Sequence, residues 1–578
     1  MVEQGAFSAK IRRPVRAVHL LIAMVLLLIF IARIASIYTE NINWDEFALM
    51  HRVVQTERTG HLISGGRPGL ATIFLLPFVG DCADEISVIH RARLLWTFLT
   101  FAYLAAVFLL LKLLNRASRH ATRDALLGVL CLAMIPPFLR WSIQVRTDQA
   151  ALALATWGGV ALLASRRYRL LALLGGFLVV AGFLCSQKAA YLVPPLGLLV
   201  MGDLWIQGDR DFQRTATRAA LSVAGAAIAY FGFYAIISLF FVPSESTASL
   251  HNVGRTFEFY RKTLGWHQYK QIAPFLVPHA FFIVLLLFAS FHWRRRNQPA
   301  DDKIRMLMAW LVLGCGLGVG LFHAAAFFYF WMTLGFFVAV AVALAQHPIR
   351  TLLGRVPLRM QRAVVGVAWV ALLIPGVLEL GYLLKDTQGI QRDSFAFLER
   401  NLDEKALGFH PESALFCQHD KKPINTYFSQ HISSRFSGAH ARENAQNLVD
   451  KFVQKPIVFI LDSWRVYSFP RPILNFWKMN YARYHASVWI PRKRIMGKAQ
   501  QPGAFRILVP GRYRWLPAAG AHDITINGAP LKGGGVVALA AGRQRFQLSR
   551  DGSGVLLYAV KDPPTPWRGP FYKPFTAW

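Results

Sequence analysis

The sequence predicts a polytopic α-helical membrane protein with a C-terminal region outside the membrane. Of its 578 residues, 54% are hydrophobic and the mean hydropathy is +0.35, which is too apolar for an ordinary soluble protein. Its apolar runs repeatedly reach the roughly 20 residues with which an α-helix spans a bilayer. After residue 385 these runs stop, and shorter helix-like and strand-like segments follow.

The basic charge of the chain indicates membrane orientation rather than nucleic-acid binding. The formal net charge is +33, and much of the excess Lys and Arg lies in short loops between apolar runs. We find no nucleic-acid-binding module. The basic loops that we expect in the cytoplasm are KLLNRASRHATR, SRRYR, RDFQRTATR, HWRRRNQPADDKIR and HPIRTLLGRVPLRMQR.

We expect eleven membrane spans. A basic segment, Lys10 to Arg16, precedes the first run, which predicts a retained signal anchor with a cytoplasmic amino end. The spans are expected at about 18–37, 92–114, 122–141, 148–165, 169–185, 189–205, 217–242, 273–292, 304–322, 325–345 and 363–384. Pro136 and Pro137 should break the third span near its outer end. An odd number of spans places everything after Lys385 outside the cytoplasm.

The first outer loop, residues 41–90, carries two adjacent carboxylates, Asp45 and Glu46. From Trp44 onward the apolar residues recur at helical spacing, which predicts an amphipathic helix lying along the membrane surface. Asn43 is a good N-cap, so the simplest role of both carboxylates is to stabilise the start of this helix. The short apolar run 69–79 predicts a second interfacial or re-entrant helix.

The C-terminal region should contain two parts beyond the membrane module of residues 1–385. Residues 386–500 mix helical and strand-like patterns and are expected to be α/β, whereas 501–578 alternate short strands with turns and predict a β-sandwich. Such sandwiches bind sugars or support a neighbouring domain, and we expect support. Five cysteines show no zinc-site or disulfide pattern. Cys82 and Cys417 fall on the same predicted side and could pair, but unpaired thiols are expected.

Two more ionisable residues lie at the predicted outer membrane edge. Asp148, in VRTDQAALAL, opens the fourth span, and Lys188, in CSQKAAYLVPP, lies between the fifth and sixth. Residues at such edges often only extend their charged ends towards water. Together with Asp45 on the same predicted side, they suggest a functional cluster.

The order of these motifs resembles glycosyltransferases of the GT-C fold. The resemblance covers roughly residues 10–240 and rests on Asp-Glu in the first outer loop, a short helix after RPG, HRARLLWTFL, an Arg-x-Asp at span four and a Lys after span five. Protein O-mannosyltransferases and the aminoarabinose transferases that modify lipid A are most similar. The resemblance implies transfer of a sugar from a polyprenyl-phosphate carrier to an acceptor outside the cytoplasmic membrane, and it leaves open whether the acceptor is a glycan, a lipid or a protein. We expect the bacterial inner membrane, because the sequence shows no organellar retention signal, and the endoplasmic reticulum is the open alternative.

The resemblance also implies roles for individual residues. Asp45 becomes the general base, and Lys188 contacts the lipid phosphate. Glu46 would assist the base or orient a basic neighbour, while Asp148 would position Arg146 or contact acceptor hydroxyls. Further substrate-binding candidates are Arg52, Arg58, Arg67, Arg146, Arg255 and His267. One attack with a single base implies inversion at the anomeric carbon. No cofactor is required; a divalent metal is possible, because carboxylates from different outer loops could converge, but it is not indicated.

Three alternatives remain open at the level of sequence. An oligosaccharide-transferring enzyme of the same fold differs in its lipid-linked donor. A transporter of lipid-linked sugars would place ionisable groups near the bilayer midplane and show repeated halves, which we do not detect. A non-catalytic scaffold for envelope assembly would keep the topology but survive loss of Asp45.

Overall fold

The computed structural model divides into two compact units that do not follow chain order. It describes residues 2–63, 68–80, 82, 84–116, 118, 120–206, 211–242, 283–284, 286–287, 290, 300–322, 331–354, 356–403, 406–410, 414–417, 436, 438–463, 465–518 and 523–561. The first unit comprises Met1–Thr39, Gln55–Phe78 and His90–Lys385. The second comprises Glu40–Val54, Val79–Ile89 and Asp386–Trp578.

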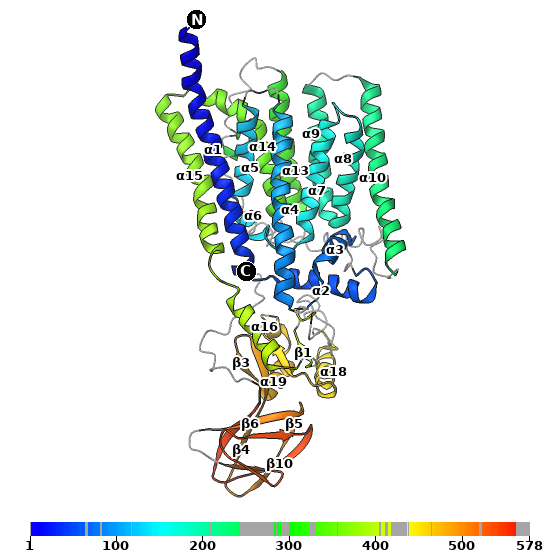
Figure 1. Cartoon of the computed structure of the whole chain (residues 1–578), viewed down its shortest axis with the longest axis vertical. Coiled ribbons are helices and arrows are strands. Elements are labelled where there is room, and N and C mark those ends of the chain that lie inside the picture. Colours follow the sequence, from blue (N-terminus) through cyan, green and yellow to red (C-terminus); the bar gives the residue numbers. More distant parts are fainter. Residues whose placement is uncertain are drawn as a thin grey trace. The chain divides into compact units, whose positions relative to one another are not determined.

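The first unit is a bundle of α-helices (Figure 1). Its helices are α1 (Val2–Thr39), α3 (Leu70–Leu75), most of α4 (Glu85–Leu114), α5 (Ala121–Ala133), α6 (Pro136–Trp141), α7 (Thr147–Ala164), α8 (Leu170–Cys185), α9 (Val193–Ile206), α10 (Phe212–Phe240), α13 (Ala300–Phe322), α14 (Trp331–Leu353) and α15 (Leu358–Leu383). Two 3-10 helices, Leu76–Phe78 and Gln187–Leu192, precede α4 and α9.

Five helices of the described residues are long and apolar enough to cross a membrane. They are Leu20–Thr39, Glu85–Leu114, Gln187–Ile206, Phe212–Phe240 and Leu358–Leu383. Their outward faces carry large apolar side chains, such as Leu239 at 78% exposure and Leu378 at 70%. Such surface is unfavourable in water and suits the hydrocarbon core of a bilayer. The chain is therefore a membrane protein, whereas the count of eleven spans stays a prediction.

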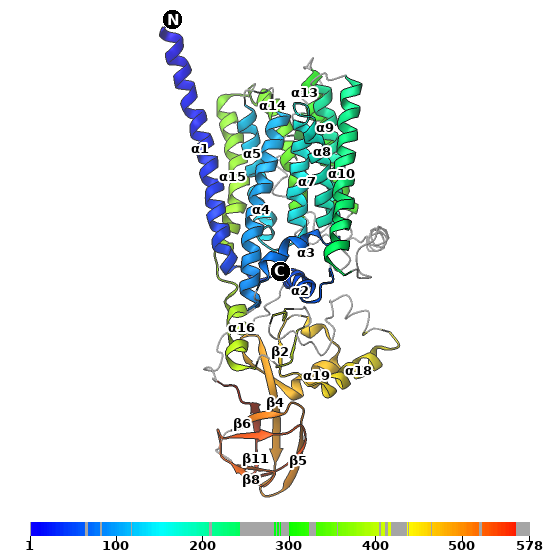
Figure 2. The same ribbon diagram turned by 45° about the vertical axis from the view of Figure 1, so that its right-hand side comes forward.

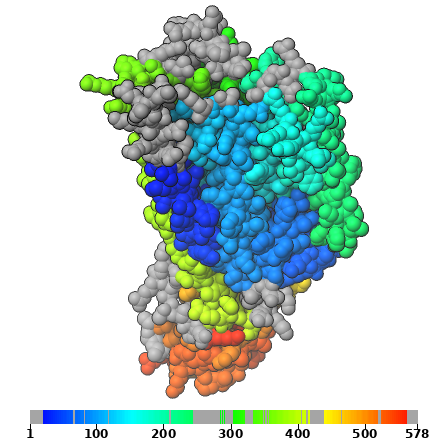
Figure 3. All heavy atoms as spheres, turned by 45° about the horizontal axis from the view of Figure 1, so that its top comes forward, coloured from blue at the N-terminus to red at the C-terminus, as the bar shows by residue number. Residues whose placement is uncertain are grey.

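Helices α8 and α10 approach each other so closely that two glycines are required. A Cβ atom at Gly176 would overlap the carbonyl oxygen of Ser222, and one at Gly225 would overlap that of Leu173. Small residues at helix crossings allow such close packing in membrane proteins. Figures 1 and 2 both show the two helices side by side, and Figure 3 shows the surface from α7 to α10, coloured cyan to green, as one closely packed face.

The predicted helix break at Pro136 is confirmed. Helix α5 ends at Ala133, Ile135 is extended, and α6 begins at Pro136. Two ion pairs join this broken segment to later helices of the first unit. The guanidinium of Arg350 donates two hydrogen bonds of 2.7 Å to Asp124, and Arg140 Nε donates one of 2.6 Å to Glu379.

The second unit combines part of the first loop with the C-terminal region. It contains the start of α2 (Trp44–Thr59), the start of α4, and helices α16 (Gly389–Asn401), α18 (Ala441–Gln454) and α19 (Arg471–Asn480). Its strands are β1 (Gly408–Phe409), β2 (Phe459–Leu461), β3 (Tyr481–His485), β4 (Val488–Gly497), β5 (Pro502–Ile507), β6 (Gly511–Pro517), β7 (Ile524–Ile526), β8 (Ala529–Leu531), β9 (Val536–Leu539), β10 (Gly542–Leu548) and β11 (Gly552–Tyr558).

Strand β4 connects the two parts of the C-terminal region. Its first residues pair with β2 and β3, and Arg492–Gly497 pair with β11, giving the order β1-β2-β4-β11-β6-β9. Only β1 and β2 are parallel in this sheet. A second sheet, β5-β10-β7-β8, is entirely antiparallel.

The short strands expected in residues 501–578 form two sheets around one core. Trp515 from the first sheet and Ile524, Phe546 and Leu548 from the second belong to the same buried cluster. The Asn-Gly dipeptide between β7 and β8 forms a tight turn, with positive φ at both Asn527 and Gly528. This turn is the type that Asn-Gly favours in antiparallel hairpins.

Candidate active site

The first turn of α2 forms a reciprocal capping box. Asn43 Oδ1 accepts a 2.9 Å hydrogen bond from the backbone N–H of Asp45, and Glu46 Oε2 accepts one of 2.9 Å from the N–H of Asn43. This arrangement satisfies backbone donors that a helix start leaves without intrahelical partners. The Glu46 side chain is fully buried, so this carboxylate has a clear structural role.

Asp45 differs from Glu46 in its exposure and in how it joins the capping box. Asp45 is half-buried, and the box uses its backbone N–H, not its carboxylate. Trp44 precedes Asp45, and the centroid of its ring lies 4.1 Å from Cζ of the Arg465 guanidinium. The turn that carries Asp45 thus contacts a distant segment of the second unit through Trp44.

Lys188 and Asp148 form an ion pair within the first unit. Lys188 Nζ lies 2.8 Å from Asp148 Oδ2, and Ser186 Oγ donates a 2.9 Å hydrogen bond to Asp148 Oδ1. Asp148 is buried, while the Lys188 side chain is 19% exposed. Both carboxylate oxygens of Asp148 therefore hold residues that follow α8.

Local backbone geometry explains why this ion pair forms. Helix α8 ends at Cys185, and Ser186 adopts an extended conformation before the 3-10 turn Gln187–Leu192 that contains Lys188. Asp148 lies in the first turn of α7, which packs against this 3-10 turn. Arg146 precedes α7 and is buried, and its carbonyl accepts a 2.7 Å hydrogen bond from Trp96 Nε1.

The remaining sequence candidates have different surroundings. Arg52 is half-buried, and its Nε donates a 2.9 Å hydrogen bond to the carbonyl of Ala48 in its own helix. Arg58 is exposed in the last turn of α2, where a cation interacts favourably with the helix dipole. Arg67, Arg255 and His267 lie outside the described residues.

The structure overturns one expectation, because Cys82 and Cys417 form a disulfide bond. Their Cα atoms are 5.0 Å apart, within the usual disulfide range. The expectation of unpaired thiols was wrong because a separation of 335 residues gives no spacing pattern, and only folding brings the two segments together. The sequence signal was their placement on one predicted side.

Sequence reasoning also missed a buried acidic residue beside this disulfide. Glu85 Oε1 accepts hydrogen bonds of 3.0 Å from the backbone N–H groups of Phe416 and Cys417. The side chain is buried, and the disulfide brings Cys82, three residues before it, to Cys417. Glu85 therefore serves the structure of the second unit.

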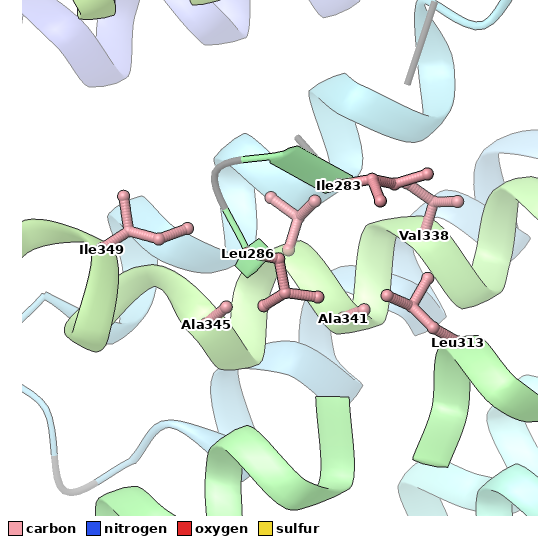
Figure 4. A pocket seen from close by; sticks show the side chains of 8 residues that line it. Ile283, Leu286, Leu313, Val338, Ala341, Ala345 and Ile349 are labelled. Carbon is pink, nitrogen blue, oxygen red and sulfur yellow. The ribbon is translucent and has the colours of Figure 1, made fainter. Parts of the chain in front are cut away.

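Two other features of the described residues bear on ligand chemistry. No group of three or more His, Cys, Asp or Glu side chains in the described part of the chain could hold a metal ion. A pocket with about 260 Å³ of empty space is entirely aliphatic (Figure 4). It is lined by Ile283, Leu286, Leu313, Val338, Ala341, Val342, Ala345 and Ile349. Such a lining offers nothing to bind a phosphate or a sugar.

Comparisons with known proteins match glycosyltransferases in structure only. No family model and no curated protein matches the sequence. ArnT from Cupriavidus metallidurans bound to undecaprenyl phosphate is 12% identical, with a TM-score of 0.49 over 82% of this chain and 97% of that chain. The Archaeoglobus fulgidus oligosaccharyltransferase is 11% identical, with a TM-score of 0.43 over 89% and 76%.

Another match is the mycobacterial arabinofuranosyltransferase AftD, which is 11% identical with a TM-score of 0.43 over 95% of this chain and 60% of that chain. These proteins are among the GT-C-fold glycosyltransferases that the motifs resemble. With TM-scores below 0.5, the likeness does not identify a function for this chain. The function is therefore argued from its own residues.

Proposed function

We propose that the chain is an integral-membrane glycosyltransferase that moves a sugar from a polyprenyl-phosphate carrier to an acceptor on the periplasmic side of the inner membrane. The observation that carries the proposal is the cluster of Lys188, Asp148 and Ser186. It combines a partly exposed ammonium with a buried carboxylate at a break between apolar helices. Ionisable residues in such segments indicate functional sites, and an ammonium is suited to bind phosphate.

The proposed reaction is a single displacement. The acceptor hydroxyl attacks the anomeric carbon of the donor sugar, and the bond between that carbon and the lipid phosphate oxygen breaks. Asp45 accepts the hydroxyl proton as general base, and the phosphate leaves with the bonding electron pair. Lys188 stabilises the negative charge that develops on the leaving phosphate. Attack from the opposite face inverts the anomeric configuration.

Asp148 is assigned to positioning Lys188 in this proposal. Its two oxygens accept from Lys188 and Ser186, so the carboxylate already has two partners next to the proposed phosphate site. An oriented ammonium loses less freedom when it binds an anion, which favours binding. Arg146 is a further proposed cation for the donor, while Arg52, Arg58, Arg67, Arg255 and His267 remain candidate substrate-binding residues.

The disulfide supports the proposed topology. Disulfides persist in the bacterial periplasm and are rare in the cytosol. Cys82 and Cys417 are paired, whereas Cys131, Cys185 and Cys315 of the described residues are free. We therefore propose that the first loop and the C-terminal region are periplasmic, that the amino end is cytoplasmic, and that eleven spans separate the amino end from the C-terminal region.

Co-purification of the donor tests this function. The full chain and its Asp45→Asn variant are purified from source cells in mild detergent, and their bound lipids are measured by mass spectrometry. We expect a polyprenyl-phosphate sugar on the variant, because binding remains while transfer stops. A longer lipid-linked glycan would instead identify the oligosaccharide-transferring alternative. The same lipids on Lys188→Met and on Asp45→Asn would contradict the role of Lys188.

A further inference from the structure

Both backbone polar groups of Ile42, just before α2, bond to the side chain of one glutamine of the C-terminal region. The backbone N–H of Ile42 donates a 2.8 Å hydrogen bond to Gln391 Oε1, and Gln391 Nε2 donates one of 3.0 Å to the carbonyl of Ile42. Ile42 and Gln391 are both fully buried. An amide side chain carries an acceptor oxygen and a donor nitrogen, so one Gln can bond to the N–H and the carbonyl of the same residue.

Further contacts fix the same short segment. The backbone N–H of Asn41 donates a 2.9 Å hydrogen bond to Thr387 Oγ1. The ring of Phe47 stacks on that of Phe395, with centroids 6.0 Å apart and 12° between the planes. Residues on both sides of Asp45 thus contact α16 or Thr387, which lies just before α16.

A second connection reaches this segment from the start of α4. Phe416 lies edge-on to Phe47, with ring centroids 6.4 Å apart. The backbone N–H groups of Phe416 and Cys417 donate to Glu85, and Cys417 is bonded to Cys82. Both loop segments of the second unit are therefore attached to the C-terminal region by buried or covalent contacts.

We propose that Gln391 is a positioning residue for Asp45, so that the C-terminal region sets the geometry of the proposed base. This inference rests on the proposed function. Ile42 lies directly before the N-cap Asn43, and Asp45 belongs to the first turn that follows. The start of a helix moves as a unit with its capping box, so a shift at Ile42 is transmitted to Asp45. A misplacement of about 1 Å costs a reaction on the order of 10²-fold in rate.

The physical alternative is that Gln391 only stabilises the fold. Removing it leaves a buried N–H and a buried carbonyl without partners, which is destabilising in itself. The two roles predict different effects on the amount of folded protein and on the activity of each folded molecule. A positioning residue lowers product formed per folded molecule, while binding of a lipid phosphate at Lys188 is unchanged. A merely structural residue lowers the amount of folded protein and leaves the activity of each folded molecule intact.

The test compares Gln391→Ala, Thr387→Val, Asp45→Asn and the control Gln446→Ala in the full chain. Gln446 is an exposed glutamine of α18 that bonds Asp450. Each variant replaces the chromosomal copy in cells that naturally make this protein. The glycan whose mass changes in the Asp45→Asn cells is identified first, and the amount of it formed per folded molecule is then measured for every variant. Binding of undecaprenyl phosphate to purified protein and hydrogen–deuterium exchange of residues 41–50 are measured in parallel. Thr387→Val keeps the test valid if Gln391→Ala does not fold.

We expect Gln391→Ala to lower glycan formation at least tenfold, with faster exchange in residues 41–50 and unchanged undecaprenyl phosphate binding. Thr387→Val should lower glycan formation several-fold, and Gln446→Ala should form as much glycan as the wild type. Asp45→Asn could abolish the glycan while Gln391→Ala and Thr387→Val both keep wild-type activity per folded molecule. That result would show that the positioning role is wrong, and the proposed function would stand. If Asp45→Asn changes no glycan, the proposed function itself fails.

Discussion

Lys188 donates a hydrogen bond of 2.8 Å from its ammonium to the buried carboxylate of Asp148, across 40 residues of chain. The pair joins the first turn of α7 to the 3-10 turn after α8. A buried ion pair is weak evidence for stability, because removing two charges from water offsets much of their attraction. Its position at a helix break, with Lys188 partly exposed, is the observation on which the proposed phosphate binding rests.

Replacement of Lys188 tests that explanation. We expect Lys188→Met to weaken binding of undecaprenyl phosphate at least tenfold, because a hydrogen bond to a charged group contributes about 1.5–3 kcal/mol. Lys188→Arg should retain part of the affinity. The control is Lys385→Met, which removes an exposed lysine after α15. Equal affinity of Lys188→Met and wild type, measured by native mass spectrometry, would rule out this phosphate site.

The Asp148 carboxylate should be coupled to Lys188 in stability. We expect Asp148→Asn to destabilise the protein by about 3 kcal/mol, the lower end for a buried pair, because Lys188 is 19% exposed. The double variant Asp148→Asn/Lys188→Met should be more stable than Asp148→Asn alone, yet bind no lipid phosphate. Thermal unfolding in detergent measures the cycle, and additive effects would show that the two residues act independently.

The disulfide should be protected from thiol reagents in intact cells. We expect Cys82 and Cys417 to react with a membrane-impermeant maleimide only after reduction, because they are paired and the proposed topology places both in the periplasm. Single variants Cys82→Ser and Cys417→Ser expose the partner thiol and serve as positive controls. Labelling that requires permeabilisation of the inner membrane would place this region in the cytoplasm.

Two glycines of α10 should respond differently to the same substitution. A Cβ at Gly225 would overlap the carbonyl of Leu173, so Gly225→Ala must separate α8 from α10 and lower the melting temperature. Gly232 has open space around its Cβ position, so Gly232→Ala should be neutral or slightly stabilising. A similar melting temperature for both variants would contradict the close approach of these helices.

The sequence predicted the features that depend on neighbouring residues. Apolar runs located the five helices that are long and apolar enough to cross a membrane, Pro136 located the break between α5 and α6, and Asn527-Gly528 forms the tight turn that this dipeptide favours. Asn43 also acts as the N-cap that its residue type favours. These features follow from local periodicity and backbone preference, which can be recognised in a short stretch of sequence.

Contacts between distant segments could not be predicted in this way. The hydrogen bonds of Gln391 to Ile42 cross 349 residues, and neither residue type is distinctive in its local context. Asp148 was expected to act on Arg146 or an acceptor. Its hydrogen bond to Lys188 depends on the end of α8 at Cys185, which the sequence pattern did not connect to Asp148. Such pairs depend on topology rather than on pattern.

The most direct measurement compares glycans and lipids of source cells that carry wild type, Asp45→Asn or Glu57→Gln. Glu57 is an exposed carboxylate on the same helix, so its replacement controls for loss of charge. The account predicts that Asp45→Asn alone removes one sugar from one glycan, lipid or protein and accumulates a polyprenyl-phosphate sugar. Unchanged glycans and lipids with a fully folded Asp45→Asn variant would contradict it, and Asp45 would then only stabilise the start of α2.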